Sequence, residues 1–121
     1  MDIGETEPSM WRGGELRAPV PANEVTFNRR ELDRILRLYG RMVAAGEWRD
    51  YAIDFMKERA VFSVFRRAAE MPIYRIEKNP RLERRQGAYS VISATGHILR
   101  RGHELDRVLS VLEPSVRLVG S

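Results

Sequence analysis

The chain of 121 residues contains no cysteine, which excludes disulfides, thiolate zinc sites, iron–sulfur clusters and cysteine nucleophiles. It also lacks any apolar run near the roughly 18 residues that a membrane-spanning helix needs. No basic-then-apolar leader opens the chain, so we expect a cytoplasmic protein. Because two sizeable cores do not fit into this length, a single folded domain is expected.

The motifs of common catalytic sites are missing as well. There is no G-x-S-x-G elbow, no G-x-G-x-x-G fingerprint and no phosphate-binding loop. The two histidines, His97 and His103, do not match a standard metal-ligand spacing, so neither a metal nor a cofactor is expected. Three nearby carboxylates, Glu47, Asp50 and Asp54, are the remaining candidates for a general acid and base. They also fit a polar helix-to-strand turn.

Positive charge is abundant and almost entirely carried by arginine. The net charge is +4, and every basic residue except Lys57 and Lys78 is an arginine. Residues 1–24 carry a net charge of −3, so the rest of the chain carries +7. The planar guanidinium group suits phosphate and carboxylate, which indicates an anionic partner. A GC-rich genome would produce the same preference for arginine without any partner.

The N-terminal part of the chain divides into an arm and a helix. Residues 1–24 are rich in glycine and proline and have no apolar period, which predicts a flexible acidic arm before a single domain over 25–121. Asn28 and Glu31 fit a capping box at the start of a helix over 29–45. Its predicted buried stripe consists of Leu32, Ile35, Leu36, Tyr39, Met42 and Val43.

Alternating apolar residues after this helix predict a series of short strands with short connections. The expected strands span approximately residues 51–55, 60–65, 73–78, 88–94 and 97–100. A second helix follows over about 105–112, and residues 116–119 fit a short edge strand. We therefore expect an α+β fold, in which an antiparallel sheet of four to five strands carries both helices on one face.

The most specific surface feature is a set of arginines at helical spacing. We expect them to form a stripe on the helix face opposite the core, although an ordinary solvated face has the same pattern. A further arginine pair follows the strand at 60–65. The hypothetical binding residues for nucleic acid or an acidic protein are Arg30, Arg34, Arg37, Arg41, Arg66 and Arg67.

The strand at 60–65 is apolar on both faces, because Val61 and Phe65 alternate with Phe62 and Val64. Two helices can cover only one face of a small sheet, and an exposed apolar patch is unusual for a soluble monomer. The other face therefore needs a cover. The arm, through Met10 and Trp11, is one candidate, and we favour a homodimer as the other.

One segment, Tyr-Gly-Arg-Met-Val-Ala-Ala-Gly-Glu-Trp-Arg-Asp-Tyr at residues 39–51, resembles the signature of a small bacterial family, domain of unknown function 2794. Residues 62–67, 74–78 and 86–91 match the same family, and the resemblance spans about residues 25–119. It implies an alphaproteobacterial cytoplasmic protein, and it brings no activity, ligand or catalytic residue.

These observations favour a non-enzymatic binding or regulatory module that presents an arginine-rich surface to an anionic partner. Two alternatives stay open. One is a small enzyme that uses the Glu47, Asp50 and Asp54 carboxylates, and the other is a structural subunit of a larger assembly.

Overall fold

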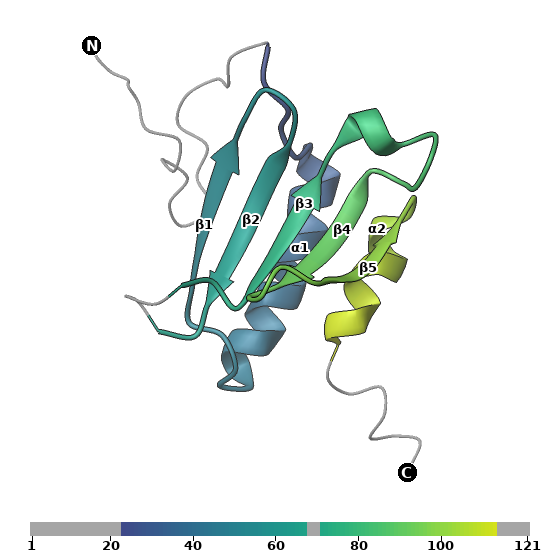
Figure 1. The fold of residues 1–121 in the computed structure, drawn as a ribbon. Helices are drawn as coiled ribbons and strands as arrows, with labels where there is room; N and C mark the ends of the chain where they lie inside the picture. Colours follow the sequence, from purple (N-terminus) through teal and green to yellow (C-terminus); the bar gives the residue numbers. More distant parts are fainter. Residues whose placement is uncertain (1–22, 68–70, 114–121) are drawn as a thin grey trace, which may run out of the picture.

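The computed structural model describes residues 23–67 and 71–113 and confirms the α+β fold (Figure 1). Five antiparallel strands form one open sheet in the order of the chain, so each strand pairs with the next. The elements are α1 (Arg29–Ala44), β1 (Asp50–Phe55), β2 (Ala60–Phe65), β3 (Tyr74–Lys78), β4 (Tyr89–Ser93), β5 (Ile98–Gly102) and α2 (Leu105–Leu109). Two 3₁₀ turns, η2 (Pro80–Leu82) and η3 (Ser110–Leu112), follow β3 and α2. The expected arm and the residues at 116–119 lie outside the described part.

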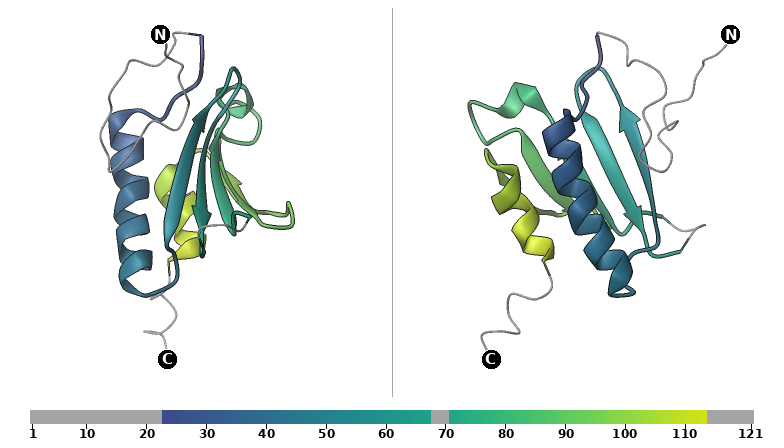
Figure 2. Two further views of the ribbon diagram at one scale, coloured as in Figure 1. Left: turned by 90° about the vertical axis from the view of Figure 1, so that its left-hand side faces the viewer. Right: turned by 180° about the vertical axis from the view of Figure 1, so that it is seen from behind.

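Both helices pack on the same face of the sheet, as predicted (Figure 2). The helix-facing row in the middle of the sheet consists of Ile53, Phe62, Ile76 and Val91, which lie opposite one another on neighbouring strands. All four side chains are buried and belong to one hydrophobic core with the helices. The alternation of apolar and polar residues along each strand produces this layer, because successive side chains point to opposite faces. Within the described ranges, no helix is long and apolar enough to cross a membrane.

The capping box at the start of α1 is confirmed. The Asn28 side chain accepts a hydrogen bond from the Glu31 amide at 2.8 Å, and the Glu31 carboxylate accepts one from the Asn28 amide at 2.8 Å. The helix ends at Ala44, and Gly46 follows with a φ of 80°, which favours glycine.

The buried stripe of α1 differs from its prediction at two positions. Leu38, which the predicted stripe omits, is fully buried, whereas Val43 is 40% exposed. The stripe is turned because α1 packs against α2 as well as against the sheet. The contact with α2 adds apolar positions on one flank of the helix and leaves Val43 outside the core.

The face of the sheet away from the helices, which the sequence predicted to be apolar and in need of a cover, has little exposed apolar surface at its centre. Val61 and Ile92, which point to this face, are 4% and 7% exposed. The large hydrophobic residues that are exposed in the described part are Val43, Met71, Ile98, Leu99 and Val111, none of which belongs to β1 through β4. The homodimer stays a prediction, which light scattering can test.

Candidate functional site

The stripe of four arginines on α1 is not a uniformly free surface, because Arg34 and Arg41 contact residues of the C-terminal elements whereas Arg30 and Arg37 are exposed. At 100° per residue, Arg34 falls close to Leu38, which is buried. The Arg34 guanidinium donates to Asp106 at 2.5 Å and to Glu113 at 3.1 Å. Arg41 donates to the same Glu113 carboxylate at 2.7 Å. Half of the stripe therefore fastens the C-terminal elements to α1.

This ion network predicts a loss of stability in the Glu113→Gln variant. The variant leaves the half-buried Arg34 with a weaker partner, so the free energy of unfolding should fall by about 1–3 kcal/mol in a urea titration. The matched control is Glu58→Gln, because Glu58 forms an exposed ion pair with Arg81 and should change stability by less than about 1 kcal/mol. An equal effect of the two variants would contradict the role of the network.

The same network predicts a dependence on pH. Burial alone would raise the pKa of Glu113, but hydrogen bonds from Arg41 and Arg34 outweigh it, so the pKa lies below its ordinary value. The stabilisation is complete above the unfolded-state pKa of about 4.5 and is lost as the pH falls through the folded-state pKa. The wild-type protein should therefore lose stability more steeply than Glu113→Gln over this acid range.

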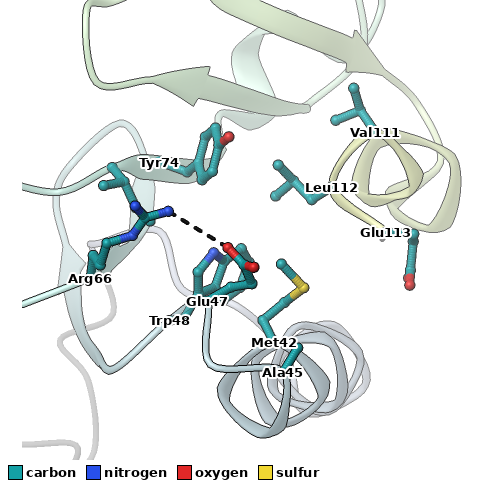
Figure 3. A pocket seen from close by; sticks show the side chains of 10 residues that line it. Met42, Ala45, Glu47, Trp48, Arg66, Tyr74, Val111, Leu112 and Glu113 are labelled. Atoms are coloured by element: carbon teal, nitrogen blue, oxygen red, sulfur yellow. Dashed lines mark ion pairs between the residues drawn. The ribbon is translucent and has the colours of Figure 1, made fainter. Parts of the chain in front are cut away.

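Arg66 lies at a different end of the molecule from Arg30, beside a cavity of about 290 Å³ (Figure 3). Its guanidinium is 3.6 Å from the Glu47 carboxylate, and the two side chains reach toward each other at the cavity. Apolar and polar side chains both contribute to the walls, which come from the end of α1, from β3 and from η3. They include Met42, Trp48, Tyr74 and Leu112. Arg67 also has an interaction partner in the chain. The charge of Arg66 is therefore balanced by the nearby Glu47 carboxylate.

The structure does not bring the three candidate carboxylates together. Asp50 and Asp54 share one face of β1 but are four residues apart, about 13 Å at the rise of a strand. Glu47 lies in the turn before β1 and is the only one of the three that lines the cavity of Figure 3. Residues that are close in sequence are separated here because the chain is extended. The enzyme hypothesis gains no support from Asp50 and Asp54, because neither lines this cavity with Glu47.

Two adjoining clefts flank the start of α2, and we refer to them as the arginine clefts. The first, of about 350 Å³, opens between α1, β4 and α2, and the second, of about 360 Å³, opens between β5 and α2. They share His103 and Glu104. The arginines that line them are Arg30, Arg34, Arg100, Arg101 and Arg107. Only Arg30 and Arg34 belong to the predicted binding residues.

The loop before β4 adds two more arginines beside these clefts. Gln86 accepts a hydrogen bond from Arg101, and the Glu83 carboxylate lies 3.3 Å from the His103 ring, so the loop sits next to β5. Arg84 and Arg85 are exposed on it. We call this surface the basic end, and it comprises Arg30, Arg84, Arg85, Arg100, Arg101, His103 and Arg107. Its acidic neighbours are Glu83, Glu104 and Asp106.

A buried carboxylate forms the floor of the first cleft. The Glu31 carboxylate accepts hydrogen bonds from the Lys78 ammonium at 2.8 Å and from the Tyr89 hydroxyl. Lys78 also donates to the Thr26 carbonyl at 2.9 Å. Burial raises the pKa of Glu31, but the bonds from Lys78 and Tyr89 outweigh it and hold the pKa below its ordinary value. Burial and the Glu31 carboxylate raise the pKa of Tyr89.

Glu31 is thus ionised and paired, and Tyr89 is neutral, so this floor anchors the cleft and does not exchange protons near neutral pH. Sequence reasoning found Glu31 only as a capping residue. Lys78 was a usable signal, because it is one of two lysines in a chain that otherwise uses arginine. A lysine ammonium donates three hydrogen bonds from one point, which suits a convergent site such as this.

The two histidines have separate surroundings. His103 lines both arginine clefts, whereas His97 lies 3.3 Å from the Thr95 hydroxyl in the turn between β4 and β5. Among the described residues, no group of three histidine or acidic side chains is arranged to hold a metal ion.

Comparison with known proteins identifies a family without a known function. The family model described as protein of unknown function (DUF2794) matches residues 25–109, which include every described strand and both α-helices. No curated protein and no solved structure matches the chain. The resemblance of the segment at 39–51 is thereby confirmed: the chain belongs to the DUF2794 family.

Proposed function

We propose that this protein is a non-enzymatic binding module that holds an anionic partner, nucleic acid or an acidic protein, at its basic end. One observation carries the proposal. The side chains of Arg30, Arg84, Arg85 and Arg100 are exposed and form no ion pair or hydrogen bond with any described residue. Phosphate or carboxylate groups would displace only water and counterions from these guanidinium groups.

The predicted arginine set changes accordingly. Arg34 and Arg41 are occupied by Glu113, and Arg66 is occupied by Glu47. Arg30 stays in the proposed surface, and Arg37, which is exposed two helical turns further along α1, extends it. The arginines that the structure adds come from the β4 loop, β5 and α2.

Paired arginines elsewhere supply a control of equal charge. Arg29 lies 3.9 Å from Asp33, and Arg75 lies 3.5 Å from Glu77. A variant with Arg29, Arg66 and Arg75 changed to glutamine therefore loses as much net charge as one with Arg84, Arg85 and Arg100 changed. Because the two variants have the same net charge, a difference in their binding affinity reports the position of the lost arginines.

Binding to labelled single-stranded DNA, duplex DNA and poly-glutamate, measured by fluorescence anisotropy across a salt series, tests the proposal. We expect salt-dependent binding to at least one of these polyanions. For DNA, each lost phosphate contact should make the negative slope of log association constant against log salt concentration shallower by about 0.7–0.9. The Arg84, Arg85 and Arg100 variant should lose about tenfold or more in affinity, and the control variant should change little. Absence of binding to all three probes at low salt, or equal losses in both variants, would overturn the proposal.

A further inference from the structure

The outer edge of β5 ends the sheet and faces no other strand of the described chain (Figure 1). An edge strand presents free backbone N–H and C=O groups that can pair with another extended segment. Ile98 and Leu99 on this strand are 48% and 42% exposed. They are the only strand residues among the exposed large hydrophobics of the described part. This edge therefore offers both a backbone ladder and apolar contact area.

The charge of the edge selects its partner. Residues 97–103 contain Arg100, Arg101 and two histidines but no acid. Pairing with β5 of a second copy would place arginines against arginines, and like charges across a strand pair are destabilising. The positive charge of the β5 edge therefore disfavours pairing with a second β5 and favours pairing with an acidic strand.

The second arginine cleft lies directly beside this edge. Arg100 and Gly102 of β5 line it together with Arg107 of α2. In a strand that adds to a sheet, alternate side chains point to opposite faces. Every second side chain of an added strand would therefore lie on the helix side of the sheet, toward Arg100 and Arg107.

We infer that the β5 edge accepts an extended acidic segment of a partner protein as a sixth strand. Backbone hydrogen bonds to β5 supply affinity, apolar side chains of the segment cover Ile98 and Leu99, and its carboxylates pair with Arg100 and Arg107. Strand addition to an exposed edge is an established mode of peptide recognition. The inference rests on the proposed function and narrows the anionic partner to a protein segment, because a nucleic acid cannot continue a β ladder.

The test uses the full chain with a short, blocked peptide of alternating valine and glutamate. An analogue in which two valines are replaced by proline keeps the charge but loses backbone donors. We expect the valine–glutamate peptide to bind and to slow hydrogen exchange of β5 amides. At about 1 kcal/mol for each lost backbone hydrogen bond, the proline analogue should bind roughly tenfold more weakly or worse.

Two surface variants complete the experiment. Leu99→Asp places a negative charge on the edge and should abolish binding of the peptide. Val111→Asp is the matched control, because Val111 is 41% exposed on η3, outside the sheet, and this variant should bind as the wild type does. Both positions are exposed, so both variants are expected to fold, which circular dichroism and thermal unfolding verify.

The outcomes separate this inference from the proposed function. Equal binding of the peptide and its proline analogue would overturn strand addition and leave anion binding intact. Binding of oligonucleotide without binding of peptide would overturn the inference in favour of a nucleic-acid partner, and failure of every polyanion would overturn both. If β5 amides of the full chain are already protected without peptide, a second copy or another segment of this chain occupies the edge, and the inference fails.

Discussion

Replacing Gly87 with alanine is expected to lower the free energy of unfolding by about 3 kcal/mol or more and to detach β5 from β4. Gly87 has a φ of 100°, a conformation that costs an L-residue about 1–3 kcal/mol. A Cβ atom at this position would lie 2.1 Å from the carbonyl carbon and 2.6 Å from the Cα of Gly102. These are backbone atoms of β5 and cannot rotate away, so the strand must move.

Gly40→Ala is the matched control, and its expected effect has the opposite sign. Gly40 lies inside α1, and a Cβ atom there meets nothing within 4 Å. Alanine in a helix interior is more favourable than glycine by about 0.5–1 kcal/mol, so this variant should be more stable than the wild type. Urea denaturation gives both free energies, and hydrogen exchange reports whether β5 amides open selectively in Gly87→Ala. A stable Gly87→Ala variant with a protected β5 would contradict the close approach of the two glycines.

The contact between Gly87 and Gly102 also shows which parts of the fold can be predicted from short segments of the sequence. The sequence predicted α1 because Asn28, Glu31 and the apolar period lie within one short segment. It predicted the strands because period-two alternation is visible over a few residues. The approach of Gly87 to Gly102 depends on the pairing of Tyr89 with Gly102 across two strands. Such pairing is a long-range property, and composition and spacing do not contain it.

The same distinction explains the outcome for the candidate site. The arginine spacing in α1 indicated one helix face correctly but did not say what packs against that face. Arg34 meets Asp106, which is 72 residues away in the sequence, and this contact turns a predicted binding residue into a structural one. The prediction that Asp50 and Asp54 share one site has the converse difficulty, because residues that are close in sequence lie far apart along an extended strand. The arginine clefts combine residues from α1, β5 and α2, so they could not be predicted from any single segment of the sequence.

Glu31→Ala should be the most damaging substitution on the helix side of the protein outside the apolar core. The variant removes the carboxylate that receives the Asn28 amide, the Lys78 ammonium and the Tyr89 hydroxyl. Lys78 is only 18% exposed in its side chain, so it would keep a charge with little water and no anion. Breaking a buried ion pair from one side costs about 3–5 kcal/mol, and we expect a loss in this range. Glu104→Ala, at an exposed ion pair with Arg107, is the control and should cost less than about 1 kcal/mol.

A double-mutant cycle with Lys78→Met separates two effects of Glu31→Ala: the unpaired Lys78 ammonium and the lost helix cap at Asn28. If the unpaired ammonium accounts for much of the damage, Lys78→Met in the Glu31→Ala background should restore stability, with a coupling energy of about 1–3 kcal/mol. The pKa of Glu31 is held below its ordinary value, so its contribution is present above the unfolded-state pKa and disappears as the pH falls through the folded-state pKa. The acid-induced loss of stability should therefore be shallower in Glu31→Ala than in the wild type. Additive effects in the cycle, together with parallel pH profiles, would show that Glu31 acts only as a helix cap. Coupling would instead establish that Glu31 joins α1 to β3 and β4 under the first arginine cleft.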